Sequence, residues 1–197
     1  EPFRLDGRRA LVTGAGRGIG RAIAQGFARA GADLVLADRD EAACSALAAT
    51  LGCASFVVDL RDRAALESLA EQAGPVDVLV CNAGISGPAG PAHEVSGEDW
   101  RGLVSVNLEH PLVLSSLVVP GMASRGSGSI VLMSSIAGLR GNKAIGAYGI
   151  TKAAIAQLAR NLAVEWGPSG VRANAIAPGL IDTEWATAIL ADDAASE

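Results

Sequence analysis

The only tyrosine in the chain, Tyr148, stands four residues before Lys152 in the stretch AYGITK. Residues four apart lie on one face of a helix, so a helix here brings the phenol and the ammonium group together. A free phenol has a pKa of about 10 and is a poor base at pH 7. One positive charge about 4 Å away contributes roughly 4 kcal/mol, about enough to bring that pKa near 7. The pair predicts proton exchange with an alcohol or carbonyl, although the same spacing also occurs in surface pairs.

A glycine-rich segment, TGAGRGIG at residues 13–20, follows an apolar run and precedes a helical pattern. A helix start presents free N–H groups and about half a positive charge, and glycines let a pyrophosphate approach the backbone. The spacing departs from G-x-G-x-x-G, and a glycine-rich turn also has a purely structural interpretation. Between a strand and a helix, however, it predicts a dinucleotide-binding loop. The loop residues expected at the cofactor are Gly14, Gly16, Arg17, Gly18, Ile19 and Gly20.

Asp38 ends the second apolar run, eighteen residues after Gly20. A carboxylate there accepts hydrogen bonds from the adenosine ribose and repels a 2′-phosphate, which favours NAD. Arg17 and Arg39 favour the opposite, because a guanidinium pairs with a 2′-phosphate. We expect NAD as the cofactor, with NADP less favoured. Asp38 could also cap the helix that follows it.

Apolar strand-like runs alternate with helical patterns along the chain. Strands are expected at residues 9–14, 32–38, 55–60, 76–84, 128–135 and 171–179, and helices at 19–30, 40–50, 97–123 and 147–166. Parallel strands need such crossovers and are covered on both faces. The pattern predicts one α/β domain, a doubly wound parallel sheet with helices on both faces, followed by a short helix and polar tail after residue 182.

Composition excludes several classes of function. The net charge of −5 without a basic run argues against a nucleic-acid surface. Three cysteines and two histidines show no metal-ligand spacing, so we expect neither a metal site nor a disulfide framework. The longest apolar stretch, residues 112–123, is shorter than the roughly 20 residues that cross a bilayer. With no secretory signal pattern at residues 1–9, we expect a cytoplasmic protein whose partners are small molecules and other subunits.

Four motifs occur in order: TGAGRGIG, NAG at residues 82–84, Tyr148-x-x-x-Lys152, and PG at residues 178–179. With them the chain resembles the short-chain dehydrogenase/reductase family over residues 5 to 183. The resemblance implies a single Rossmann-type domain that binds NAD(P) and transfers a hydride between the cofactor and an alcohol or carbonyl. It also implies a homo-oligomer, either a dimer or a tetramer.

The resemblance implies roles for individual residues as well. The family's serine stands thirteen residues before the tyrosine, which selects Ser135 over Ser134, and strand alternation sends the two serines to opposite sides. The implied catalytic residues are Asn107, Ser135, Tyr148 and Lys152, with Asn107 anchoring a water that passes a proton from Lys152. Further cofactor contacts are expected at Asp59, Leu60, Asn82, Ala83, Gly84, Tyr148, Lys152, Pro178, Gly179, Ile181 and Thr183.

We therefore expect an NAD-dependent oxidoreductase acting on a secondary alcohol, polyol-like or sugar-like, with Tyr148 as general acid/base. The loop at residues 84–92 has no basic residue for a phosphorylated carrier, which disfavours an acyl-carrier reductase. An NADPH-dependent carbonyl or 3-oxoacyl reductase that uses Arg17 and Arg39 is the alternative within enzymes. A further alternative is an inactive nucleotide-binding regulator or assembly subunit, because residues 1–197 lack the additional helix and strand that the resemblance implies.

Overall fold

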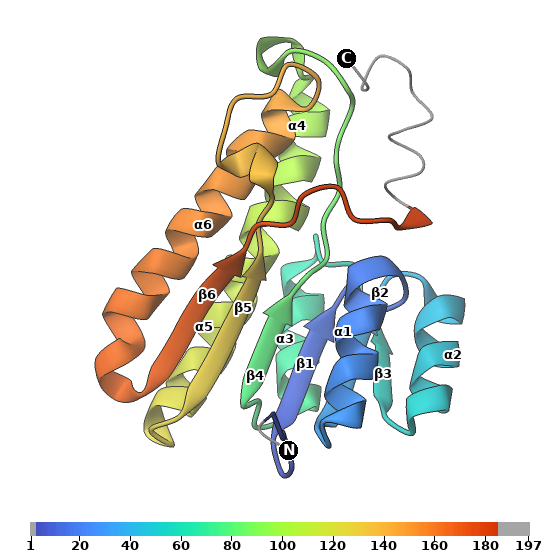
Figure 1. The fold of residues 1–197 in the computed structure, drawn as a ribbon, viewed down its shortest axis with the longest axis vertical. Coiled ribbons are helices and arrows are strands. Elements are labelled where there is room, and N and C mark those ends of the chain that lie inside the picture. The colour runs from blue at the N-terminus through green and yellow to red at the C-terminus, as the bar shows by residue number, and fades with distance from the viewer. Residues whose placement is uncertain (1–2, 185–197) are drawn as a thin grey trace.

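Figure 1 shows a computed structural model of the chain, which describes residues 3–184. Six strands form one sheet in the order β3-β2-β1-β4-β5-β6, and every neighbouring pair is parallel. This confirms the doubly wound parallel sheet. The strands are β1 (Arg9–Thr13), β2 (Asp33–Asp38), β3 (Ala54–Val57), β4 (Val78–Cys81), β5 (Gly128–Met133) and β6 (Val171–Ile176).

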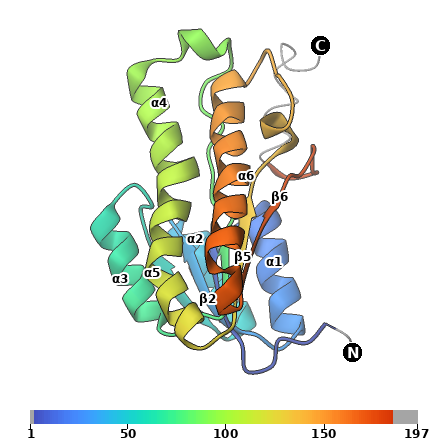
Figure 2. The ribbon, with the colours of Figure 1, turned by 90° about the vertical axis from the view of Figure 1, so that its left-hand side faces the viewer.

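Helices cover both faces of the sheet. Buried residues of α1 and α2 pack on one face, and those of α3, α5 and α6 pack on the other. Figure 2 shows α5 and α6 running side by side along the second face. The helices are α1 (Gly18–Arg29), α2 (Glu41–Leu51), α3 (Arg63–Ala73), α4 (Gly97–Val104), α5 (His110–Ser124) and α6 (Gly146–Trp166), with short turns η1 (Ala92–Glu94), η2 (Ser105–Glu109), η3 (Ile136–Gly138) and η4 (Gly167–Ser169).

Side-chain alternation along the strands explains the two layers. On β1, Leu11 packs toward α3, α5 and α6, whereas Ala10 and Val12 pack toward α1 and α2, and all three are fully buried. A strand buried on both faces is apolar at every position, which is why these segments appear as continuous apolar runs in the sequence. Because all strands are parallel, their carboxyl ends meet at one edge. The order reverses at β1 and β4, which is where such sheets bind ligands.

The long helix expected at residues 97–123 is interrupted. α4 passes into a π-helical turn, η2, before α5 begins, and the backbone N–H of His110 bonds to the carbonyl of Ser105, five residues earlier. A π turn inserts one extra residue into a helix and is frequent at functional sites. Here the extra residue lies in the segment that contains Asn107.

Residues Gly97–Ser124 are long and apolar enough to cross a membrane, with a mean hydropathy of 1.4 in their most apolar window. Leu114, Val118 and Met122 of α5 nevertheless pack into the core cluster beneath the sheet. The apolar character of this stretch is accounted for by its place as a core helix.

Two further parts of the sequence prediction need correction. Helix α3 lies where no helix range was assigned. Asp62 caps it by accepting a hydrogen bond from the N–H of Ala64 at 2.9 Å, and Leu66 and Leu69 are buried. Strands β3, β4 and β6 end before their expected limits, because the residues beyond them form loops at the carboxyl edge. The short helix and tail expected after residue 182 fall almost entirely outside the described residues.

Candidate active site

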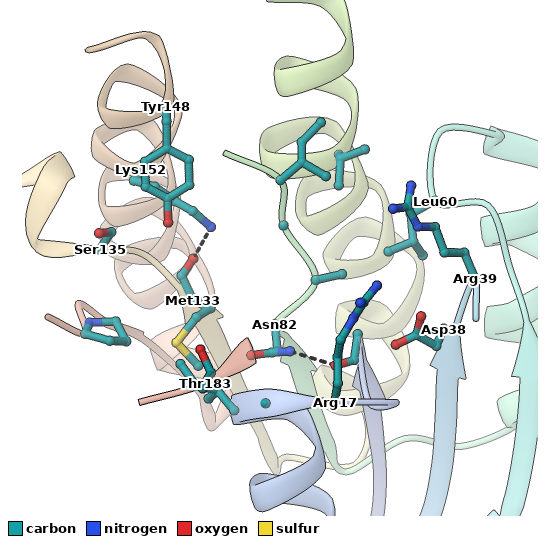
Figure 3. Close-up of a pocket in the computed structure, with 18 of the residues that line it drawn as sticks. Arg17, Asp38, Arg39, Leu60, Asn82, Met133, Ser135, Tyr148, Lys152 and Thr183 are labelled. Carbon is teal, nitrogen blue, oxygen red and sulfur yellow. Dashed lines mark hydrogen bonds between the residues drawn. The ribbon is translucent and has the colours of Figure 1, made fainter. Parts of the chain in front are cut away.

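A cavity of about 300 Å³ opens at the carboxyl edge of the sheet (Figure 3). Ser135, Tyr148 and Lys152 lie at one end of it, Arg17, Asp38 and Arg39 at the other, and Asn82 between them. The expected site residues that line it are Gly14, Arg17, Gly18, Ile19, Asp38, Arg39, Asp59, Leu60, Asn82, Ala83, Gly84, Ser135, Tyr148, Lys152, Pro178, Gly179, Ile181 and Thr183.

Gly16 and Gly20, expected at the cofactor, do not line the cavity. The N–H of Gly16 donates to Asp38 Oδ2 at 2.9 Å, so this glycine ties the loop to the end of β2. A Cβ at Gly20 would collide with the carbonyl oxygen of Gly14, which means that Gly20 lets α1 pack closely against the turn. Both glycines shape the loop rather than line the pocket.

The start of α1 fits a pyrophosphate. Arg17 at the N-cap makes no side-chain capping bond, and the first turn contains no acidic residue. The positive end of this twelve-residue helix therefore has no anionic side chain of its own helix to balance it. Gly14, at φ 65°, lies so close to the segment after β4 that a Cβ would come within 2.7 Å of the Cα of Ala83. The absence of a side chain at Gly14 thus lets the glycine loop pack against this segment, next to the free helix start where a phosphate would bind.

Asn82 fixes the middle of the cavity. Its side-chain amide donates to the carbonyl oxygens of Thr13 at 3.2 Å and Gly14 at 3.0 Å. β4 is thereby joined to the glycine loop that follows β1. The side chain thus holds together the two loops that meet where the strand order reverses.

Asp38 lies buried at the opposite end of the cavity from Tyr148. Its carboxylate accepts hydrogen bonds from the N–H of Gly16 at 2.9 Å and from the N–H of Asp40 at 3.0 Å. Arg17 and Arg39 line the same end. An acid and two guanidinium groups thus face the region where an adenosine ribose would lie. The helix-capping bond at α2 comes from Asp40, whose side chain accepts from the N–H of Ala43.

Asp59 is engaged by a residue that the sequence analysis did not select. Arg61 also lines the cavity, and its guanidinium pairs with the Asp59 carboxylate at 2.5 Å. The hydrogen bonds from Arg61 lower the pKa of Asp59 to about 2. Asp59 is therefore a fixed anion, already paired, at the rim of the adenosine end.

Lys152 lies inside the protein with 3% of its surface exposed. Its Nζ donates a hydrogen bond to the carbonyl oxygen of Met133 at 2.7 Å and lies 5.4 Å from the centre of the Tyr148 ring. Ser135, which follows β5 and caps η3, forms a side-chain hydrogen bond with Tyr148. α6 and the end of β5 thus bring a phenol, an ammonium group and a hydroxyl together.

The electrostatics of this group differ from the sequence prediction. Burial raises the pKa of Tyr148, and the hydrogen bond from Ser135 only partly opposes this. Burial also lowers the pKa of Lys152 to about 8. Burial of the phenol therefore opposes the lowering of the Tyr148 pKa that the sequence predicts from Lys152.

Asn107 is buried and does not line the cavity. Its Oδ1 accepts from the N–H of Ile85 at 2.8 Å, and its Nδ2 donates to the Ile85 carbonyl at 2.9 Å and to Thr151 Oγ1 at 3.1 Å. A side chain at Gly84 would lie 3.3 Å from Asn107 Oδ1 and 3.2 Å from Lys152 Nζ. The arrangement places Asn107 behind the loop after β4, where it holds the backbone of Ile85.

Ser134 and Ser135 have separate partners. Ser134 is buried, and its Oγ donates to the carbonyl oxygen of Lys152 at 2.7 Å, so it joins β5 to α6. Ser135 Oγ accepts a hydrogen bond from the N–H of Ala137 at 3.2 Å and is also hydrogen-bonded to the Tyr148 side chain. The geometry gives Ser135 the position next to the phenol.

Other lining residues were not anticipated: Val58, Arg61, Ile85, Gly102, Val106, Met133, Ser134 and Glu184. Val58, Arg61, Met133 and Ser134 lie just at or beyond the carboxyl end of a strand, and that position alone is a signal that could have found them. Gly102 and Val106 come from the helix that carries the π turn, for which the sequence gives no such signal. Within residues 3–184, no group of three or more His, Cys, Asp or Glu is placed to hold a metal ion, and Cys44, Cys53 and Cys81 are free thiols.

Comparison with known proteins agrees with this geometry. A family model described as short chain dehydrogenase matches residues 8–194. Gluconate 5-dehydrogenase of Gluconobacter oxydans (strain 621H) is 37% identical over 97% of this chain and 78% of its own length, and galactitol 2-dehydrogenase (L-tagatose-forming) of Cereibacter sphaeroides is 41% identical over 92% and 74%. A crystal structure from Beutenbergia cavernae, described as an NAD(P)-dependent gluconate 5-dehydrogenase with bound NADP at low occupancy, superposes with a TM-score of 0.90 at 42% identity, covering 100% of this chain and 81% of that one.

Proposed function

The chain belongs to the short-chain dehydrogenase family, and from this premise we propose that it oxidises a secondary alcohol of a polyol-like or sugar-like substrate with NAD. As a member of this family it is an oxidoreductase that acts on CH–OH groups with a nicotinamide cofactor. The observation that carries the proposal is the shared cavity, in which Ser135, Tyr148 and Lys152 face the glycine loop and Asp38. We also propose that residues 1–197 form one dinucleotide-binding and catalytic domain.

In the proposed reaction Ser135 holds the substrate oxygen and Tyr148 accepts its proton. When bound, the oxidised nicotinamide supplies the hydride acceptor and one positive charge. The alcohol carbon loses a hydride, its oxygen loses a proton to the Tyr148 phenolate, and a carbonyl remains. The buried cation of Lys152 favours the phenolate, as would any second positive charge nearby. Lys152 then gives a proton to a water held by Asn107 behind the loop and regains one from the protonated Tyr148, so that the proton of the alcohol reaches solvent and the phenolate is restored.

Two observations support a polyol or sugar-like substrate. The relatives named above act on gluconate and galactitol, judged by their names. The loop at residues 84–92, which follows the cavity-lining residues Asn82 and Ala83, carries no lysine or arginine for a phosphorylated carrier. A multihydroxylated substrate needs hydrogen-bonding groups rather than a cationic docking site.

NAD is proposed on the strength of Asp38, whose buried carboxylate is held in place by two backbone N–H groups. A 2′-phosphate beside this anion would be repelled. A second candidate is an NADPH-dependent carbonyl reductase, favoured by Arg17 and Arg39 in the cavity and by NADP in the Beutenbergia cavernae structure. Titration with NADH and with NADPH separates the two candidates, and binding of NADPH at least tenfold tighter would overturn the choice of NAD.

We further propose a homo-oligomer, a dimer or tetramer, in a cytoplasmic location. Large apolar side chains are exposed on the outer sides of α5 and α6, namely Leu112, Leu117, Ile150 and Val164. A second copy of the chain that covers these two helices would remove this apolar surface from water. Cell fractionation with an antibody against the chain would test the location.

The experiment that tests the proposed reaction is a screen of polyols, sugars and sugar acids that follows nicotinamide absorbance with both NAD and NADP. Tyr148→Phe is the matched control, because it removes only the proton-accepting oxygen. We expect this variant to bind NADH as the unmodified protein does and to lose at least about 10²-fold in turnover. If no alcohol reduces either cofactor, or if Tyr148→Phe turns over unchanged, the proposed reaction is wrong.

A further inference from the structure

A buried chain of hydrogen bonds connects the π-helical turn to the floor of the cavity. It begins at His110, the first residue of α5, which is completely buried and takes no part in the proposed reaction. Because the backbone N–H of His110 bonds to Ser105, five residues back, the carbonyl oxygen of Val106 receives no α-helical bond from it. The imidazole takes that place, with Nδ1 at 2.5 Å from the Val106 oxygen.

This contact settles which ring nitrogen carries the proton. A carbonyl oxygen only accepts hydrogen bonds, so Nδ1 is the protonated nitrogen. In the neutral imidazole, Nε2 is then an acceptor. Burial lowers the pKa of His110 to about 4, which keeps the ring neutral at pH 7.

Nε2 of His110 lies 3.2 Å from the hydroxyl of Thr13, which is also completely buried. Since Nε2 accepts, the Thr13 hydroxyl donates to it. Both lone pairs of Thr13 Oγ1 are then directed elsewhere, and the N–H groups of Asn82 at 3.2 Å and Ala83 at 3.3 Å point at this oxygen. Every member of the chain therefore has a definite role as donor or acceptor.

We propose that His110 is a positioning residue for the cavity floor at residues 82–84, acting through the Thr13 hydroxyl. The imidazole fixes the direction of the Thr13 O–H, and the freed oxygen lone pairs hold two successive backbone N–H groups at the start of the loop after β4. Asn107, from the same π turn, holds the next residue, Ile85, by both its N–H and its carbonyl. Residues of this turn thus hold Asn82, Ala83 and Ile85, three residues that line the cavity.

Thr13 has one competing acceptor, the carbonyl oxygen of Val80 at 3.5 Å, which is farther away than the imidazole. If the hydroxyl donated to Val80 instead, it would still accept from Asn82 and Ala83, and His110 would only fill space. The two arrangements differ in whether Nε2 of His110 accepts a hydrogen bond from the Thr13 hydroxyl. The expected effect of His110 on cofactor affinity rests on the proposed function, whereas the hydrogen bond to Nε2 can be tested without it.

The first test therefore uses the ligand-free protein. The chain has two histidines, so a His93→Gln background leaves the ring nitrogens of His110 as the only imidazole signals in ¹⁵N NMR. His93 is exposed and does not line the cavity, so this background leaves the chain of hydrogen bonds intact. At pH 7 we expect Nδ1 to be protonated, Nε2 to be unprotonated, and the Nε2 resonance to shift in Thr13→Val. The proposal would be overturned by a protonated Nε2, or by an Nε2 resonance whose chemical shift is the same in Thr13→Val.

The second test measures amide hydrogen exchange at Asn82 and Ala83 without ligand. In His110→Leu we expect both amides to exchange about tenfold faster, because Thr13 loses the acceptor that orients it. In His110→Gln the side-chain carbonyl can replace Nε2 and should restore protection to within about threefold of the unmodified protein. Met122→Ala is the control for general destabilisation, since Met122 is buried on the same helix far from the cavity lining. Equal exchange in the Leu and Ala variants would contradict a positioning role.

The third test measures dissociation constants for NADH and NADPH. We expect His110→Leu to weaken the preferred cofactor about tenfold, His110→Gln by less than about threefold, and Met122→Ala not at all. If the unmodified protein binds neither cofactor, the proposed function fails while the first two tests still judge His110. If it binds one of them and His110→Leu binds equally well, the role of His110 in the site is wrong.

Discussion

The ammonium group of Lys152 donates its hydrogen bond to the carbonyl oxygen of Met133, 2.7 Å away. This contact lies in the protein interior, where burial lowers the pKa of Lys152 from 10.5 to about 8. At pH 7 the lysine is still charged, so the folded protein holds a cation that its surroundings disfavour. A shift of about 2.5 pKa units corresponds to about 3 kcal/mol.

Lys152→Met is expected to stabilise the ligand-free protein while abolishing turnover. The free energy of unfolding at pH 7 should rise by about 1–2 kcal/mol, since removal of the buried charge outweighs the lost hydrogen bond to Met133. Chemical denaturation measures this change. The other lysine of the chain, Lys143, is exposed, and Lys143→Met is the control that should change stability little.

The sign of the pH effect gives a check on the same residue. Between pH 8 and 10.5 the unfolded chain keeps the Lys152 proton and the folded protein loses it, so the Lys152 contribution to stability rises with pH across this window. In Lys152→Met that rise should be absent. A variant less stable than the unmodified protein at pH 7 would mean that the buried charge is better compensated than its pKa indicates.

Tyr148 can be titrated directly, because it is the only tyrosine in the chain. Since burial raises its pKa, tyrosinate absorbance in the ligand-free protein should appear only above pH 10. Ser135→Ala should move the midpoint higher still, because the Ser135 hydrogen bond lowers that pKa. Added NAD should move the midpoint lower. A ligand-free midpoint near pH 7 would show that Lys152 alone activates the phenol.

Asp38→Ala is expected to affect both cofactor choice and stability. Loss of the carboxylate removes the repulsion toward a 2′-phosphate, so the ratio of NADH to NADPH affinity should shift toward NADPH by about tenfold. The N–H groups of Gly16 and Asp40 lose their acceptor, which should lower the free energy of unfolding by about 1–2 kcal/mol. Arg39→Ala is the comparison variant, expected to weaken NADPH alone. If the two variants shift the ratio of NADH to NADPH affinity in the same direction, Asp38 does not distinguish the ribose hydroxyl from a 2′-phosphate.

His110 predicts a loss of stability in mild acid. Its pKa is about 4 in the folded protein and 6.5 in an unperturbed chain, so between these values the unfolded state binds a proton that the folded state does not. The contribution to stability therefore falls as pH drops from 6.5 to 4, by about 3 kcal/mol in total. Denaturation curves of His110→Gln measured over the same range should lack this component, whereas those of His93→Gln should retain it.

Val164→Glu tests the proposed oligomer. Val164 is 79% exposed on α6, where it would be covered by a second copy of the chain. A charge introduced there should dissociate the oligomer, as measured by light scattering on a gel-filtration column. Arg160→Glu, one helical turn away, is the comparison for a change of charge on the same helix. A protein that is monomeric before any substitution would refute the proposal.

Much of the fold could be predicted from the sequence because parallel strands buried on both faces leave continuous apolar runs. Several site residues could also be predicted from the sequence, because each depends on spacing within one or two elements. They are the glycine loop, Asp38, and the pair of Tyr148 and Lys152. The cavity brings all of these together. Even the overlooked helix α3 carries a readable capping residue in Asp62.

What the sequence could not predict depends on packing between distant segments. The π turn has no compositional signature, yet it contains Asn107, which bonds to Ile85, and leads directly into His110, which contacts Thr13. The Tyr148 pKa is raised because burial outweighs the Ser135 hydrogen bond, although the neighbouring Lys152 charge predicted the opposite. Spacing in the sequence specifies the charge, whereas only the assembled structure specifies the burial.

The hydrogen bond from Asn82 to the carbonyl of Gly14 also has a consequence for how the chain folds. These residues are 68 positions apart in the sequence. Strands β2 and β3 lie between them in the sequence, but in the sheet they lie on the side of β1 opposite to β4. A growing chain must therefore return across its own first strand before the two halves of the site can meet, and closing so long a loop is slow. Until β4 has docked beside β1, the nascent polypeptide has a glycine loop but no second wall for a dinucleotide, so cofactor capture requires this return of the chain.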